Sequence, residues 1–259
     1  MYGRRNSGFG PPVTPPIIKN LIIANLAVFV VQHLGELGFY VRELGAIRPH
    51  DVWGRSFIWQ PFSYMWLHAQ GTPWHVGFNM FSLWMFGSPI ASTWGEKRFL
   101  RYYLACGVGA GCLIATLPYL TMYAGWGTTP LDLVIPTVGA SGAVMGVLLA
   151  YSFTWPSRTI MLLFPPIPLK AIWLIPLLFF MEFSTGPGNV SHAGHLGGVL
   201  VGWIYLVREG RTPGAPTLDK LSHRYRRYRM RQKLRAVHDE TRRDRQRGWN
   251  DDDNDRKYH

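Results

Sequence analysis

Residues 137–155 read TVGASGAVMGVLLAYSFTW, an apolar run with Ser141 near its start, and residues 191–207 read SHAGHLGGVLVGWIYLV, with His195 near its start. Each run is close to the length that a helix needs to cross a membrane. Ionisable and polar residues at membrane depth are costly, so they are interpreted first as functional. A serine and a histidine are also the smallest set that supplies a nucleophile and its base. The two runs therefore predict a helical membrane protein with a hydrolytic site inside the membrane.

The composition agrees with a membrane protein. The chain is 47% hydrophobic and 16% charged, whereas soluble chains have about 25% charged residues. Its 11 Trp and 12 Tyr fit aromatic belts at the two membrane interfaces. The sequence divides into a short amino-terminal segment (residues 1–15), an apolar helical domain (residues 16–207) and a polar, basic tail (residues 208–259).

The pattern of apolar blocks predicts an all-α, polytopic bundle of six transmembrane helices. We expect a kink in the fifth span at Pro176, and we find no internal repeat that would favour a transporter. The expected spans are Pro16–Leu34, Trp74–Thr93, Phe99–Tyr119, Thr137–Trp155, Leu169–Phe183 and Ser191–Val207.

Lys and Arg in the short links set the expected orientation, with both termini in the cytoplasm. The links at 120–136 and 184–190 contain neither residue, whereas the links before the first, third and fifth spans do. The link after the first span is an exception to this rule, because it carries Arg42, Arg48 and Arg55. It is long and rich in Trp, Phe and Tyr, so we expect it to fold as an interfacial element. No cleavable signal peptide is evident at the amino terminus.

The tetrapeptide GASG (residues 139–142) stands where a loop becomes a helix. A helix start offers unpaired backbone N–H groups and the positive end of the helix dipole, which could hold an oxyanion next to Ser141. Gly139 would permit close approach of the backbone. The alternative is a helix-packing face of small residues, since Gly142 and Gly146 form a GxxxG pair.

The second motif, GHLGG (residues 194–198), places His195 before another GxxxG pair, Gly198 and Gly202. Two helices that face each other through glycines pack with little between their backbones. Ser141 and His195 would then meet near the same depth. A lone histidine in a span could instead make only an interhelical hydrogen bond.

His75 and Asn79 lie four residues apart on the second expected span, so they share a helix face. Both can donate hydrogen bonds to an oxyanion, and the alternative is buried polar contact between helices. His192 with His195 could suggest a metal site, but no carboxylate or cysteine joins them. We therefore expect no metal and no cofactor.

The motifs HVGFN (residues 75–79), GASG and GHLGG, in this order and spacing, resemble the rhomboid family of intramembrane serine proteases, bacterial type. The resemblance covers about residues 15–207. It implies a six-helix core and a catalytic dyad with Ser141 as nucleophile and His195 as general base. It implies an oxyanion hole of His75, Asn79 and the Ser141 backbone N–H. It also implies a first loop near Trp59–Pro73 and a mobile cap near Phe183–Val190.

Three positions depart from the family pattern. The family often has Trp-Arg in the first loop, where this chain has Trp59-Gln60. A glutamate common near the end of the second span corresponds to Ala91, with Glu96 displaced beyond it. The position one turn after the serine, often aromatic, is Met145, whose polarizable sulfur can still pack on an imidazole. These departures concern the anchoring of the loop and the orientation of the histidine.

The sequence thus predicts a serine endopeptidase that cleaves transmembrane proteins in a multi-pass protein of the bacterial inner (plasma) membrane. Substrates should unwind easily near the cut, because a helix hides its carbonyls. The alternatives are a rhomboid-like pseudoprotease that binds membrane clients, and a transporter lined by histidines. The tail has 15 Lys or Arg against 8 Asp or Glu from residue 211 on, which favours anionic lipid or a solvated tail. No nucleic-acid partner is expected.

Overall fold

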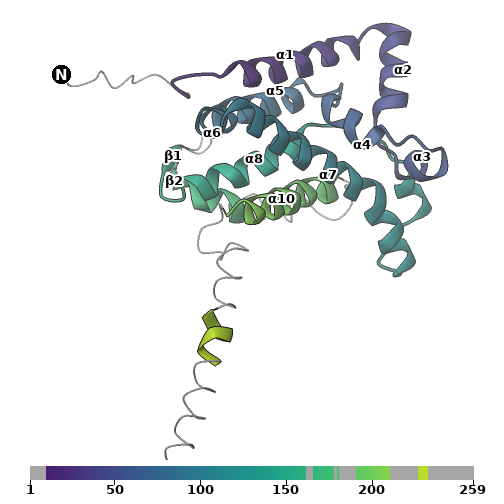
Figure 1. The fold of residues 1–259 in the computed structure, drawn as a ribbon. Helices are drawn as coiled ribbons and strands as arrows, with labels where there is room; N and C mark the ends of the chain where they lie inside the picture. The colour runs from purple at the N-terminus through teal and green to yellow at the C-terminus, as the bar shows by residue number, and fades with distance from the viewer. Residues whose placement is uncertain (1–9, 162–165, 178–179, 181–190, 211–226, 233–259) are drawn as a thin grey trace, which may run out of the picture. The chain divides into compact units, whose positions relative to one another are not determined.

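The computed structural model describes residues 10–161, 166–177, 180, 191–210 and 227–232, and Figure 1 draws the fold. Most of these residues are helical; η1, η3 and η4 are 3₁₀-helices and η2 is a π-helix. The elements are α1 (Pro16–Val31), α2 (Gly35–Gly45), α3 (Pro49–Gly54), α4 (Gln60–Ser63), η1 (Tyr64–Trp66), α5 (Pro73–Ser82), η2 (Leu83–Gly87), α6 (Ser88–Trp94), α7 (Glu96–Tyr123), η3 (Pro130–Leu133), α8 (Ser141–Thr154), β1 (Thr159–Met161), β2 (Pro168–Lys170), η4 (Ala171–Trp173) and α10 (Ser191–Arg208).

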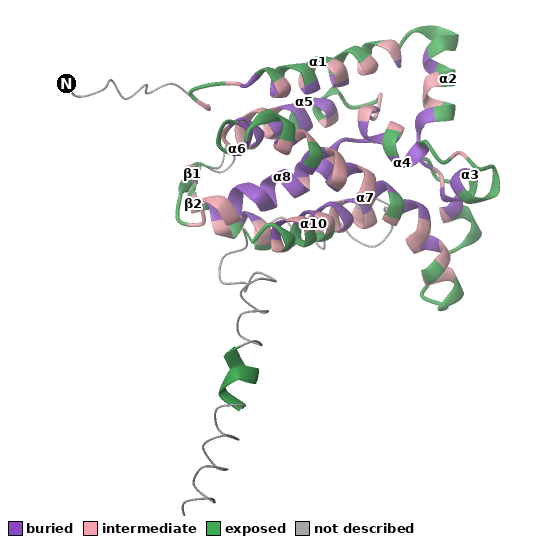
Figure 2. Ribbon diagram, viewed as in Figure 1, coloured by how far each residue is buried: buried purple, intermediate pink, exposed green. Residues whose placement is uncertain are grey.

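Helix α8 is the central helix of the bundle. Its sequence is apolar on every side, and a helix of this kind is stable only when it is buried. Figure 2 shows α8 buried along most of its length, and it contacts α5, α6, α7 and η2. The helix that begins at Ser141 is therefore enclosed by other helices.

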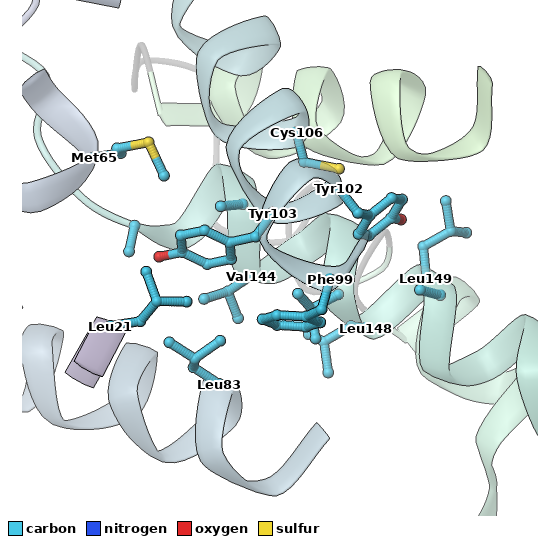
Figure 3. Close-up of a cluster of buried hydrophobic side chains, with 14 of the residues drawn as sticks. Leu21, Met65, Leu83, Phe99, Tyr102, Tyr103, Cys106, Val144, Leu148 and Leu149 are labelled. Carbon is cyan, nitrogen blue, oxygen red and sulfur yellow. The ribbon is translucent and has the colours of Figure 1, made fainter. Parts of the chain in front are cut away.

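Aromatic side chains of α7 fill the core between α8 and the helices before it. Phe99, Tyr102 and Tyr103 are completely buried. In Figure 3, Phe99 and Tyr103 lie toward Leu83 of η2 and Val144 of α8, and Tyr102 lies near Cys106. Such large side chains bury most of the apolar area in a core. This cluster fixes α7 against α8 and leaves the small residues further along α7 facing the site.

The second expected span runs from α5 through η2 to α6 without a break. The π-helical turn at Leu83–Gly87 widens the helix by one residue. A Cβ at Gly87 would lie 3.1 Å from Ile18 and 3.2 Å from Phe99. This turn therefore sits where α1 and α7 come close to the second span.

By length and hydropathy, one described helix, α7, is sufficient to cross a membrane. The pair α1 and α2 qualifies only if the two helices, bent by 119°, count as one span. Helices α1 and α8 have 16 and 14 residues, or about 24 and 21 Å at about 1.5 Å per residue, short of a hydrocarbon core of about 30 Å. The number of spans therefore stays a prediction.

The fourth and fifth spans were expected to begin at Thr137 and Leu169, and in the structure neither residue is helical. Residues 137–140 are not helical: Thr137 pairs with Ile47 in an antiparallel bridge and Gly139 has a φ of +134°, so α8 begins only at Ser141. Leu169 and Lys170 belong to β2, which pairs with β1 in register Ile160 to Leu169. The expectation of a purely α-helical chain is wrong at this hairpin. Residues 178–179 and 181–183 of the fifth span lie outside the described part of the chain.

The link after the first span folds as α2, α3, α4 and η1, and Gln60 anchors it. The buried Gln60 side chain accepts a hydrogen bond from the Arg48 backbone N–H at 3.1 Å, where α3 begins. The carboxylate of Asp51 in α3 forms ion pairs with the guanidinium groups of Arg48, at 3.7 Å, and Arg55, at 3.4 Å. A neutral glutamine thus connects two short helices of the link.

The start of α1 has a partner from α7. The carboxylate of Glu96 accepts a hydrogen bond from the backbone N–H of Ile17 at 3.0 Å. A negative charge is favourable at a helix amino terminus, where the N–H groups lack intrahelical partners. Glu96 therefore supplies a contact between spans that Ala91, itself buried, cannot make.

The chain divides into two compact units. One comprises Met1–Leu206 with Arg211–Pro213, and the other comprises Val207–Gly210 with Gly214–His259. In the second unit the described residues 227–232 are helical and exposed. The remaining tail and the expected cap near Phe183–Val190 lie outside the described residues.

Candidate active site

Ser141 and His195 are in direct contact. The Nε2 atom of His195 lies 2.7 Å from the Oγ atom of Ser141, although the residues are 54 positions apart. This distance is within the range for O–H···N hydrogen bonds between a nucleophile and its base. Both residues are half-buried, so the pair lies within the bundle and is still accessible.

The start of α8 exposes backbone N–H groups beside Ser141. No side chain caps this helix, so its first N–H groups are free to bind an anion. Gly139 has a φ of +134°, a conformation that side-chain-bearing residues rarely adopt. Its N–H donates to the carbonyl of Tyr64 at 3.0 Å. The turn before Ser141 is thus fixed by the first link.

Helices α8 and α10 pack backbone to backbone. A Cβ atom at Gly198 would overlap the carbonyl oxygen of Gly142, and one at Gly202 would lie 3.3 Å from the Cα of Gly146. A Cβ at Gly142 would in turn lie 3.2 Å from the carbonyl of Gly194. The two GxxxG pairs therefore face each other, and this close approach brings His195 to Ser141.

Helix α7 forms the third wall of this junction. The Tyr102 hydroxyl donates to the Gly146 carbonyl at 2.6 Å, and Cys106 fills the space beside Gly146. Ala110 occupies the space beside Gly142, 2.7 Å from where a Cβ would be. Sequence reasoning missed these residues, although their spacing of four places them on one helix face.

His75 is held next to the same turn. Its Nδ1 atom accepts a hydrogen bond from the backbone N–H of Ala69 at 3.2 Å. A Cβ at Gly139 would lie 3.2 Å from the Nε2 atom of His75 and 3.6 Å from the Oγ of Ser141. The space that this glycine leaves open is therefore bordered by both side chains.

Asn79 lies one turn after His75 on α5 and is buried. Its amide nitrogen donates to the carbonyl of His75 at 2.8 Å. An amide nitrogen carries two hydrogens, so this bond uses one of them. The oxyanion role expected for Asn79 would need the other.

Two further expectations concern Met145 and metal binding. Met145 is half-buried on α8 and packs against the hydrophobic core. Within the described ranges, no three His, Cys, Asp or Glu side chains gather as a metal site would require.

Comparisons with known proteins identify the family of this chain. The family model of the rhomboid domain matches residues 55–211. The chain is 30% identical to Rhomboid protein 1, mitochondrial, of Saccharomyces cerevisiae over 196 residues, which cover 72% of this chain and 52% of that protein. It is 31% identical to RHOMBOID-like protein 12, mitochondrial, of Arabidopsis thaliana over 207 residues, 75% of this chain and 59% of that protein. It is 28% identical to Rhomboid protease GluP of Bacillus subtilis over 131 residues, 50% of this chain and 22% of that protein.

The chain therefore belongs to the rhomboid family, and it is an integral, multi-pass helical membrane protein. It spans a little over half the length of the yeast and Arabidopsis relatives.

The glycine contact between α8 and α10 generates a stability prediction. Gly198→Ala should destabilise the protein by about 1–3 kcal/mol, because added carbon in a close-packed contact forces the helices apart. Gly77→Ala is the matched control, since a Cβ there would meet nothing within 4 Å. Thermal unfolding in detergent should give a lower Tm for Gly198→Ala and an unchanged or higher Tm for Gly77→Ala. Equal Tm values would contradict the packing.

Proposed function

We propose that the protein is an intramembrane serine endopeptidase with Ser141 as nucleophile and His195 as general base. The observation that carries this proposal is the 2.7 Å contact between His195 Nε2 and Ser141 Oγ at the start of α8. Membership of the rhomboid family supports it. The related Bacillus subtilis protein is named a rhomboid protease.

The length of α8 supports a site inside the membrane. Trp155 and Arg158, just after α8, have the residue types of a membrane interface. Fourteen residues span about 21 Å of a hydrocarbon core of about 30 Å. Ser141 would then lie below the opposite interface, and water would reach it through an opening on that side.

The reaction would proceed by covalent catalysis. His195 takes the proton of the Ser141 hydroxyl while Oγ attacks the carbonyl carbon of the scissile peptide bond. The resulting oxyanion would occupy the space beside Gly139, which His75 borders, and the proposed donors to it are His75, Asn79 and the N–H groups at the start of α8. His195 then gives its proton to the leaving amine. Water, activated by the same histidine, hydrolyses the acyl-enzyme and restores both groups.

The substrates we propose are transmembrane segments of other proteins. The attacked carbonyl must be free of helical hydrogen bonds, so Gly, Pro or other residues that weaken a helix should lie near the cut. We also propose six spans with both termini in the cytoplasm. The membrane we propose is the bacterial plasma membrane, and the mitochondrial names of the yeast and Arabidopsis relatives make a mitochondrial membrane the alternative. Imaging a tagged chain in its native cell distinguishes the two.

The dyad can be tested with a fluorophosphonate probe, which reacts only with an activated serine. The purified chain should be labelled at Ser141 and should cut some members of a panel of single-span proteins, as read by mass spectrometry. Ser141→Ala and His195→Ala should abolish both signals, because either change removes half of the dyad.

Ser152→Ala is the matched control. Ser152 is a buried serine of the same helix whose hydroxyl donates to the Leu148 carbonyl at 2.8 Å, and its loss should leave labelling intact. Undiminished labelling of Ser141→Ala would sink the assignment. A folded wild type that neither labels nor cuts would favour the pseudoprotease.

The oxyanion donors make a second prediction. Removing one donor lowers kcat by about 10²–10³-fold in hydrolases. His75→Ala and Asn79→Ala should therefore lower kcat much more than they raise KM, while the backbone N–H groups leave residual activity. His33→Ala, at an exposed histidine, serves as control. If the variants yield less folded protein, but each folded molecule is as active as the wild type, then these residues have a structural role only.

We propose that residues 208–259 form a separate cytoplasmic part that binds anionic headgroups, at about 1 kcal/mol per basic residue near the surface. In support, described residues 227–232 are helical, exposed and basic. Truncation after Gly210 should leave activity in neutral detergent unchanged and reduce activity in phosphatidylglycerol vesicles. Added salt should likewise reduce the activity of the full chain in these vesicles, because it screens the attraction to the headgroups. Loss of activity in neutral detergent would instead make the tail part of the enzyme.

A further inference from the structure

Gln32, where α1 ends, clamps a segment of the first link. Its buried side chain donates from Nε2 to the carbonyl of His68 at 3.0 Å and accepts from the His68 N–H at 2.9 Å. The side chain of Gln70 donates back to the Gln32 carbonyl. The Gln32 amide thus pairs with the His68 backbone as one strand pairs with another. Together with the bond from Gln70, this pairing holds residues 68–70 against the end of α1.

The next N–H in this clamped segment fixes the chemical form of His75. The backbone N–H of Ala69 donates to Nδ1 of His75, and a backbone N–H can only donate. Nδ1 must therefore be unprotonated, and the neutral ring carries its hydrogen on Nε2. Nε2 and the neighbouring Cε1 are the ring atoms that border the open space at Gly139 beside Ser141, 3.2 and 3.0 Å from where a Cβ would be, and of these two only Nε2 can donate a hydrogen bond. The bond from Ala69 consequently turns a donor toward that space.

The ring of His68 packs against the ring of His75. It is buried, and the two rings meet edge to face, with 5.3 Å between the centroids. Burial, with a smaller contribution from His75, lowers the pKa of His68 to about 4, so it is uncharged at neutral pH. The side chain next to His75 therefore holds the ring in place without adding a positive charge.

We infer that Gln32 is a positioning residue, which acts through the Ala69 N–H to hold His75 as the Nε2–H tautomer. The inference rests on the proposed role of His75 as an oxyanion donor. In the other tautomer a lone pair of Nε2 would face the oxyanion and the donor would be lost.

A double-mutant cycle tests this coupling. Gln32→Met keeps the length of the side chain and removes both bonds to His68. It should lower the rate of fluorophosphonate labelling of Ser141 at least about tenfold, towards the loss expected for a missing donor. In the His75→Ala background the same change should have no further effect, because its target is absent. A purely structural role would lower labelling equally in both backgrounds and would overturn the inference.

Asn25→Leu is the matched control, since Asn25 is another buried amide of α1, bonded to the Leu21 carbonyl at 2.7 Å. Its effect on labelling should be the same with and without His75. Ala69→Pro removes the N–H without touching Gln32 and should reproduce the loss, whereas Ala69→Gly keeps the N–H and should not.

The tautomer itself is measured by nitrogen NMR of the chain with ¹⁵N-histidine, where the His75 signals are those absent from His75→Ala. Nδ1 should be unprotonated in the wild type and partly protonated in Gln32→Met. A protonated Nδ1 in the wild type would contradict the inference even if a variant fails to fold. A wild type that is not labelled at Ser141 refutes the proposed function instead, while the NMR still reports on the clamp.

Discussion

The close approach of α8 and α10 is the constraint on which the site depends. The carbonyl of Gly142 occupies the place where Gly198 would otherwise carry a side chain, so the distance between the two helices is set by backbone atoms. Backbone atoms have no rotamers to exchange, and a contact between them fixes position more firmly than a contact between long side chains. The 2.7 Å contact of Ser141 and His195 is a consequence of this spacing. Tyr102 and Cys106 of α7 then close the junction from the third side.

The first link has an equally direct part in the site. It supplies the Tyr64 carbonyl that holds Gly139 and the Ala69 N–H that holds His75. It also pairs with the extended segment before α8 through Ile47 and Thr137. Both sides of the space beside Ser141 are thus positioned by one segment outside the long helices.

The contact of Ser141 with His195 could be predicted from the sequence because its signals are local. Serine and histidine each stand beside a GxxxG pair, and glycine spacing alone predicts that the two faces can meet. The bonds of Gln32 could not be predicted, because its partners are backbone atoms 36 residues away and backbone atoms leave no mark in a sequence. The same holds for the start of the fourth span, which was expected at Thr137: that residue pairs with the distant Ile47, and the helix begins only at Ser141. The β1–β2 hairpin was missed because each of its strands has only three residues.

The shortness of α8 and its central place in the bundle require each other. A lipid-facing helix of 14 residues would leave several ångströms of hydrocarbon unmatched, and the bilayer would have to thin around it. Because α5, α6 and α7 contact α8, these helices would shield its ends from acyl chains, and no such mismatch would arise. A bundle of this kind could therefore hold a helix of 14 residues, about 21 Å in a hydrocarbon core of about 30 Å, without deforming the bilayer.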